Sequence, residues 1–124
     1  MTILFHSTFV NSHMKGVTIR NAELTGNNFD GADMSKSQWV QDTVSSNNSF
    51  VGADLSNSFW YDVYFQESKQ PSNFTDANLS GISVTAQGVS SGPHELTEAE
   101  MPSLKAILCR TAFSEGYSNR DSKK

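Results

Sequence analysis

The sequence predicts a solenoid, a rod of short stacked repeats, and three observations support this fold class. First, three ten-residue stretches, at 28–37, 49–58 and 73–82, nearly superimpose. Second, a large apolar residue recurs at every fifth position over most of the chain. Third, a mostly small residue stands two positions before each large one. A period of five fits neither an α-helix nor a β-strand, whose periods are about 3.6 and 2.

The five-residue series contains sixteen large residues and two interruptions. One residue is inserted after Val44 and four after Phe65. The small residues that precede the large ones are Ser7, Ser12, Ala22, Ala32, Ser37, Ala53, Ser58, Ser72 and Ala77. A single unit cannot bury its own side chain, so stacking between units must supply the core.

These units resemble the pentapeptide-repeat family, whose pattern is Ala-(Asp/Asn)-Leu-x-x. The matches are Ala32-Asp33-Met34, Ala53-Asp54-Leu55 and Ala77-Asn78-Leu79, and Ala22-Glu23-Leu24 nearly fits. The resemblance covers residues 2–86. It implies an all-β fold, a right-handed quadrilateral β-helix of about four coils, with four pentapeptides in each coil.

In this fold the large residues form four columns, one on each side of the coil. The predicted columns are Leu4, Leu24, Val44, Phe65; Phe9, Phe29, Phe50, Phe74; Met14, Met34, Leu55, Leu79; and Ile19, Trp39, Trp60, Val84. The second column contains only Phe if both insertions are looped out. This consistency fixes the predicted register.

The two ends of the β-helix leave strand edges open, and open strand edges recruit other chains. We expect the β-helix over residues 1–86, a loop and a C-terminal capping α-helix over 87–113, and a flexible polar tail over 114–124. Thr97 to Glu100 form a capping box, and Leu104, Ile107 and Leu108 share a helix face. At the first coil we expect either a second copy of the chain or a missing N-terminal domain as the cover.

Composition excludes several classes of function. The chain has 124 residues and a net charge of −4, which disfavours direct nucleic-acid binding and docking on anionic membranes. It has no apolar run long enough to span a membrane, and Cys109 is the single cysteine. From the first residues we expect no signal peptide. We therefore expect a cytoplasmic protein, or one delivered into a host cell as an effector.

The sequence predicts no catalytic residues, no metal site and no cofactor, and hence no enzyme. His6, His13 and His94 lie far apart in the expected fold and lack partners at metal-ligand spacing. Cys109 has no histidine nearby in the sequence, as a reactive thiol usually requires. Ser12 and Lys15 match a Ser-x-x-Lys pattern, but Ser12 occupies an inward position of the repeat.

An aromatic cluster is the predicted partner-binding site. With Trp60 and Phe65 inside, Phe59, Tyr61 and Tyr64 face outward, and Val40 lies one coil from Tyr61. Exposed aromatic groups often mark contact sites. The projecting loop after Phe65 adds the residues Glu67, Lys69 and Gln70 to the predicted site. The alternative is that the C-terminal segment, with Phe113 and Tyr117, covers the cluster.

The predicted function is a non-catalytic scaffold that presents a β-helix face and a loop to a partner protein. One alternative is the substrate-binding part of a bacterial effector that resembles a ubiquitin ligase. Another follows from the family resemblance, since some members mimic DNA and bind DNA gyrase. Residues 2–86 carry eight acidic and four basic side chains, and Asp33 and Asp54 are expected to stack.

Overall fold

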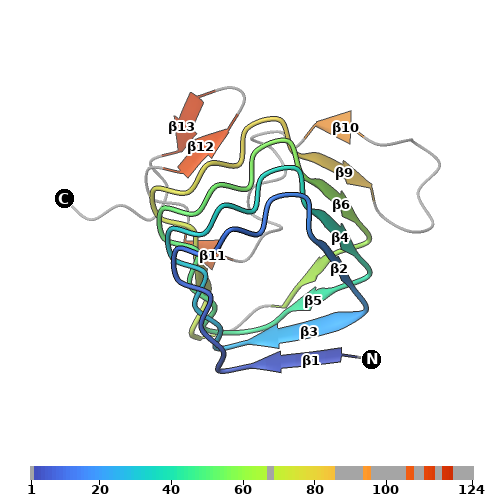
Figure 1. Cartoon of the computed structure of the whole chain (residues 1–124), viewed down its shortest axis with the longest axis vertical. Coiled ribbons are helices and arrows are strands. Elements are labelled where there is room, and N and C mark those ends of the chain that lie inside the picture. Colours follow the sequence, from blue (N-terminus) through green and yellow to red (C-terminus); the bar gives the residue numbers. More distant parts are fainter. Residues whose placement is uncertain are drawn as a thin grey trace.

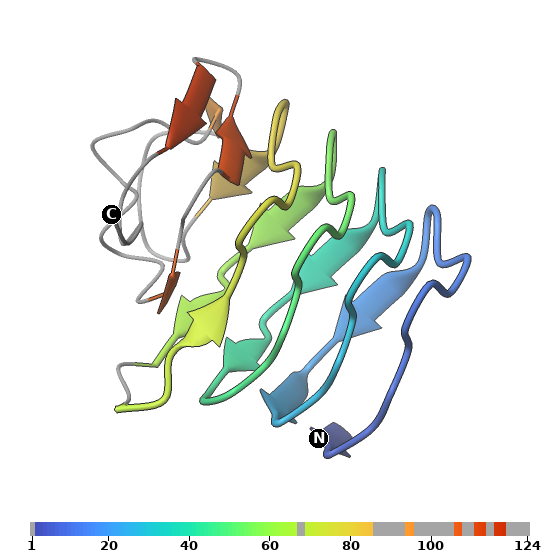
Figure 2. The same ribbon diagram turned by 90° about the vertical axis from the view of Figure 1, so that its left-hand side faces the viewer.

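The computed structural model describes residues 2–66, 69–85, 94–95, 106–107, 111–113 and 116–118. The chain winds into stacked four-sided coils, which are seen end-on in Figure 1 and side-on in Figure 2. We number the four sides in the order in which the first coil reaches them. They carry Leu4, Phe9, Met14 and Ile19, respectively.

Parallel sheets form the first and fourth sides. The first side consists, in spatial order, of β1 (Thr2–Phe5), β3 (Ala22–Thr25), β5 (Thr43–Val44) and β7 (Tyr64–Phe65). The fourth side consists of β2 (Thr18–Arg20), β4 (Gln38–Val40), β6 (Phe59–Tyr61) and β9 (Ser83–Thr85), and β10 (His94–Glu95) adds an antiparallel strand beyond β9. Single parallel bridges join the coils on the second and third sides, and β8 (Ser72–Asn73) lies on the second.

The observed register confirms the predicted columns. Leu4 pairs with Leu24, Leu24 with Val44, and Val44 with Phe65 along the first side. Equivalent residues on successive coils are separated by 20, then 21, then 24 positions. Both predicted insertions are therefore accommodated outside the ladder, the first of them between Val44 and Asn48.

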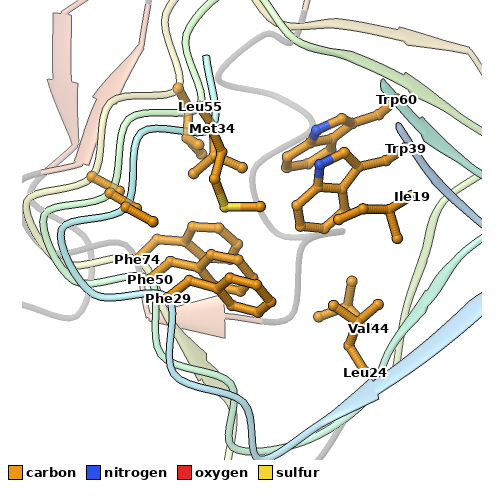
Figure 3. Close-up of a cluster of buried hydrophobic side chains, with 14 of the residues drawn as sticks. Ile19, Leu24, Phe29, Met34, Trp39, Val44, Phe50, Leu55, Trp60 and Phe74 are labelled. Atoms are coloured by element: carbon orange, nitrogen blue, oxygen red, sulfur yellow. The ribbon is translucent and has the colours of Figure 1, made fainter. Parts of the chain in front are cut away.

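The core consists of the stacked columns (Figure 3). Phe9, Phe29, Phe50 and Phe74 stack with ring centroids 4.9, 4.9 and 4.6 Å apart and nearly parallel planes. Trp39 and Trp60 stack at 5.4 Å across the interior from the Phe column. Met34, Leu55 and Leu79 are fully buried, whereas Phe9 and Met14 in the first coil are only half-buried. Burial of the middle coils supplies the main stabilisation of this fold.

Two local features explain the polar positions of the repeat. At the corners of the regular units, the second residue after the large one has positive φ. Nine of the described non-glycine residues adopt this conformation, including Asn11, Lys36 and Asp62, and one of them, Asn47, is the third residue after Val44 because of the insertion. Asn and Asp tolerate this conformation better than most residues. In addition, the Asp or Asn before a large residue accepts the N–H two positions later, as Asp33 does from Ser35 and Asn78 from Ser80. This Asx-type contact favours the turn.

The predicted capping helix is wrong where the structure describes the C-terminal segment. Ala106–Ile107 form β11, which pairs in parallel with β8, and Thr111–Phe113 form β12, which pairs antiparallel with β13 (Gly116–Ser118). Ala112 also bridges Asn78 in parallel, so β11 and β12 continue the second and third sides. The β-ladder beyond β8 offers backbone partners that a helix could not use, and this pairing overrides the helical pattern. Residues 96–105 and 108–110 lie outside the described residues.

Candidate protein-interaction surface

Two outward aromatic side chains and one aliphatic side chain form a patch on the fourth side. Alternation along β6 places Trp60 in the core and leaves Phe59 and Tyr61 half-buried on the outer surface. Their ring centroids are 6.5 Å apart, with planes inclined by 22°. Val40 pairs with Tyr61 on the preceding coil and is also half-buried. We call Val40, Phe59 and Tyr61 the aromatic patch.

Polar side chains surround the aromatic patch. Arg20 pairs with Val40 from the first coil, and Gln38 pairs with Phe59. On the next coil, Ser83 is the register partner of Phe59. Arg20 and Gln38 are exposed. An apolar centre with a polar rim is the usual organisation of a protein–protein interface.

The structure divides the predicted aromatic cluster between two sides. Tyr64 is 63% exposed, but it lies on the first side, in β7. The corner at Asp62, where φ is 55°, separates it from Tyr61. Sequence spacing alone placed Tyr64 close to Tyr61, whereas the corner turns the two side chains onto different sides.

The predicted loop follows Phe65 at the corner between the first and second sides. Lys69 and Gln70 are exposed, and the Gln70 carbonyl accepts the N–H of Asn47 at 2.7 Å. This bond anchors the loop to the third coil. Glu67 lies outside the described residues. The loop is therefore adjacent in the chain to Tyr64 and not to the aromatic patch.

The described parts of the C-terminal segment do not lie over the fourth-side patch. Phe113 belongs to β12, whose Ala112 bridges Asn78 on the third side, and Tyr117 pairs through its backbone with Ala112. In Figure 1, β12 and β13 lie at the upper left of the coil, away from β6 at its right. Over the residues that the structure describes, the patch remains accessible.

Among the described residues, no three His, Cys, Asp or Glu side chains are close enough to hold a metal ion. His6 stacks on Phe5 with ring centroids 3.9 Å apart, and His13 is exposed on the third side, as expected. Cys109 lies outside the described residues. In the part of the chain that the structure describes, no helix is long and apolar enough to cross a bilayer.

The acidic side chains do not form one continuous surface. Asp33 and Asp54 do stack on the third side, as predicted, but Glu23 lies on the first side and Asp30 on the second. Several acids also serve the fold, because Asp33, Asp54 and Asp30 accept backbone N–H groups of Ser35, Ser56 and Val51, respectively. The bonds from the Ser35 hydroxyl and N–H hold the pKa of Asp33 below its usual value.

Sequence reasoning counted Asp42 among the surface acids, but the structure buries it. Its exposed fraction is 1%, and one carboxylate oxygen has no partner among the described residues. Burial raises the pKa of Asp42 to about 6, against the opposing effect of the Ala22 N–H. A signal was present in the sequence, because Asp42 stands two positions before Val44, where the repeat places an inward residue.

Comparisons with known proteins identify the repeat. Residues 2–37 match the family model "Pentapeptide repeats (8 copies)". Comparison with curated proteins gives no match. Among solved structures, the chain is similar to HetL, a pentapeptide repeat protein involved in heterocyst differentiation regulation from the cyanobacterium Nostoc sp. strain PCC 7120. The identity is 16% and the TM-score 0.24, over 92% of this chain and 48% of HetL, so this chain spans about half of HetL. Residues 2–37 thus match the pentapeptide-repeat model, and five-residue units continue to stack in the same register through Thr85.

Proposed function

We propose that this protein is a non-catalytic scaffold whose aromatic patch on the fourth side binds a partner protein. The observation that carries the proposal is the stacked pair of Phe59 and Tyr61 beside Val40 on a regular parallel sheet. Aromatic side chains supply large contact area at low cost in conformational entropy. Their backbone is held on both sides by β4 and β9, so little ordering is required on binding.

The shape of the patch defines the kind of partner that fits. A flat sheet surface matches an apolar surface with a hydrogen-bonding group that can reach the Tyr61 hydroxyl. Arg20 and Gln38 at the rim favour polar or acidic groups at the margin of the partner's surface. The loop with Lys69 and Gln70, together with Tyr64, forms a second contact area that a large partner reaches around the corner.

The test is a pull-down from extracts of the native cell with the wild type and with a Phe59→Ala/Tyr61→Ala variant. The variant loses the partner, while its thermal melt remains close to that of the wild type. Val10→Ala is the control, because it removes an exposed apolar side chain from the second side of the first coil, outside both contact areas, and it retains the partner. Equal capture by the wild type and the double variant would reject the patch. A large loss of stability in the double variant would assign the two side chains to folding.

Two alternative proposals, an effector and a DNA mimic, are distinguished by other experiments. As the substrate-binding part of an effector delivered into a host cell, the chain would bind its substrate through the same patch, next to a ubiquitin-ligase-like domain. As a cytoplasmic DNA mimic, it would inhibit or protect DNA gyrase, and a supercoiling assay tests this directly. The distribution of Glu23, Asp30 and Asp33 over three sides makes the DNA mimic the weaker alternative.

A further inference from the structure

The strand at the edge of the first side carries two of the most exposed apolar side chains. In β1, Ile3 is 64% exposed and Phe5 is 59% exposed, and both point outward. Within the described part of the chain, β1 pairs only with β3, so its other edge presents unpaired backbone groups. A regular edge strand with exposed apolar residues is a template for another strand.

The two edge strands of the first coil differ in whether charged side chains protect them from pairing with another strand. β2, at the corresponding edge of the fourth side, carries the exposed Arg20, and Lys15 lies shortly before it. β1 consists of Thr, Ile, Leu and Phe and contains neither a charge nor a proline. Charged side chains and prolines are the usual devices that block pairing at an edge. The first side is therefore the part of this end that is open to pairing.

We propose that β1 pairs antiparallel with β1 of a second copy of this chain, with Leu4 opposite Leu4. Directly opposed residues in an antiparallel pair point to the same face. With Leu4 at the centre, Ile3 of each copy lies opposite Phe5 of the other copy on the outer face. The half-buried Leu4 side chains meet on the inner face, which continues the first column into the second copy.

This register follows from the strand itself. Pairing shifted by one residue would place outward Ile3 opposite inward Leu4, which the alternation of the strand forbids. Pairing centred on Ile3 would overlap only residues 2–4 and leave Phe5 without an opposed residue of β1. Only the register centred on Leu4 matches both apolar outward residues with each other. Phe5 is also held in place, because its ring stacks on His6, which in turn lies against Gly26.

The proposal uses a different surface from the aromatic patch, so the two can fail independently. The first test is sedimentation equilibrium of the full chain over a range of about 1–500 µM, where small interfaces associate. The wild type shifts from monomer to dimer over this range. Phe5→Lys raises the dissociation constant of the dimer at least about tenfold, because it places charge on the edge.

The matched control is Val10→Lys, which changes another exposed apolar residue of the first coil that lies on the second side. This variant dimerises like the wild type. A wild type that remains monomeric throughout, or a dimer that Phe5→Lys leaves unchanged, would overturn the proposal. Equal loss of the dimer in both variants would also overturn it. Thermal melts of both variants establish that each is folded.

A cross-linking experiment tests the register. Ile3→Cys and Phe5→Cys are made separately in a Cys109→Ser background, then oxidised alone and as a mixture. Opposed residues have Cβ atoms about 4.5–5.5 Å apart and diagonal ones about 7–8 Å, and disulfides require the shorter separation. The mixture therefore forms a disulfide-linked heterodimer, at least about fivefold faster than either variant alone links to itself. Equal linkage in the single variants would overturn the Leu4-centred register.

Discussion

The Asp42 carboxylate accepts the backbone N–H of Ala22 at 2.8 Å, one coil away inside the tube. Its Oδ1 forms this bond, whereas Oδ2 is buried and has no partner among the described residues. Charged carboxylates are poorly solvated in such a site, and the pKa of Asp42 rises to about 6. Ionisation of Asp42 therefore opposes folding.

The first prediction concerns the pH dependence of stability. The folded-state pKa of Asp42 lies above its unfolded value of 3.8, so the favourable neutral form is fully present below about pH 4 and is lost as pH rises through about 6. At about 1.4 kcal/mol per pKa unit, the loss is about 3 kcal/mol. In Asp42→Asn, Oδ1 still accepts the Ala22 N–H and no charge forms. Urea melts should find this variant more stable than the wild type at pH 8 and no more stable at pH 4.

Asp33 provides a control in which stability changes with pH in the opposite direction. Hydrogen bonds from Ser35 lower its pKa, so its contribution is present at neutral pH and is lost as pH falls through the lowered folded-state pKa. Asp33→Asn should therefore be less stable than the wild type at pH 8 and should approach it at low pH. If the stability difference between Asp42→Asn and the wild type is constant from pH 4 to pH 8, Asp42 is not buried as described.

The second prediction tests the Phe column. Phe50 is fully buried and stacks on both Phe29 and Phe74, so Phe50→Ala should lower the free energy of unfolding by about 3–5 kcal/mol. Phe9 occupies the same column at its end and is only half-buried. Phe9→Ala should therefore cost clearly less than Phe50→Ala in the same urea melt. Equal costs at the two positions would contradict the stacking order.

The third prediction concerns a buried ladder of asparagines. Asn48 donates from Nδ2 to the Leu24 carbonyl at 2.9 Å, and its Oδ1 accepts both the N–H and the Nδ2 group of Asn27 at 3.1 Å. Asn48→Ala leaves the Asn27 N–H buried without a partner, at about 1–3 kcal/mol. The Asn27 Nδ2 group keeps its bond to the Leu4 carbonyl, and the Leu24 carbonyl keeps its bond from the Ser45 N–H. Chemical denaturation should therefore show a loss of about 2–4 kcal/mol.

Asn28 provides the comparison for this ladder. It is half-buried and accepts a single N–H, that of Asp30, at 2.9 Å. Asn28→Ala should cost about 0.5–1.5 kcal/mol, since water can replace part of the contact. A smaller loss for Asn48→Ala than for Asn28→Ala would show that the ladder does not stabilise the fold.

The inward-facing side chains could be predicted from the sequence because the core requires a large apolar side chain at every fifth residue. Columns such as Phe29, Phe50 and Phe74 follow from spacing alone, and even the insertions were located by keeping the Phe column intact. The resemblance supplied the four sides of the coil. The five-residue spacing and the four-sided coil together are enough to predict the register.

The outward half was less predictable, because corners redirect side chains that are close in sequence. Tyr61 and Tyr64 are three positions apart, yet the left-handed corner at Asp62 places them on different sides. The C-terminal helix was wrong for another reason. A capping box and apolar spacing express local preference, and pairing of Ala106–Ile107 with β8 overrides it. In retrospect Ala106, Thr111 and Ala112 stand where the ladder continues.

The fourth prediction uses the glycines at the corners of one column. Gly31 and Gly52 both have positive φ, and a Cβ at Gly52 meets no atom within 4 Å, whereas one at Gly31 lies 2.2 Å from Asn11 Oδ1. Gly52→Ala should cost about 1–2 kcal/mol through backbone strain alone. Gly31→Ala should cost more, because the Asn11 side chain must also move.

The matched variant for this comparison combines Asn11→Gly with Gly31→Ala. Asn11 also occupies a positive-φ corner, so glycine is tolerated there and the clash with position 31 is removed. The cost of Gly31→Ala, measured against Asn11→Gly alone, should fall to that of Gly52→Ala in urea melts. An unchanged cost would place its origin in the backbone and reject contact with Asn11 as the cause.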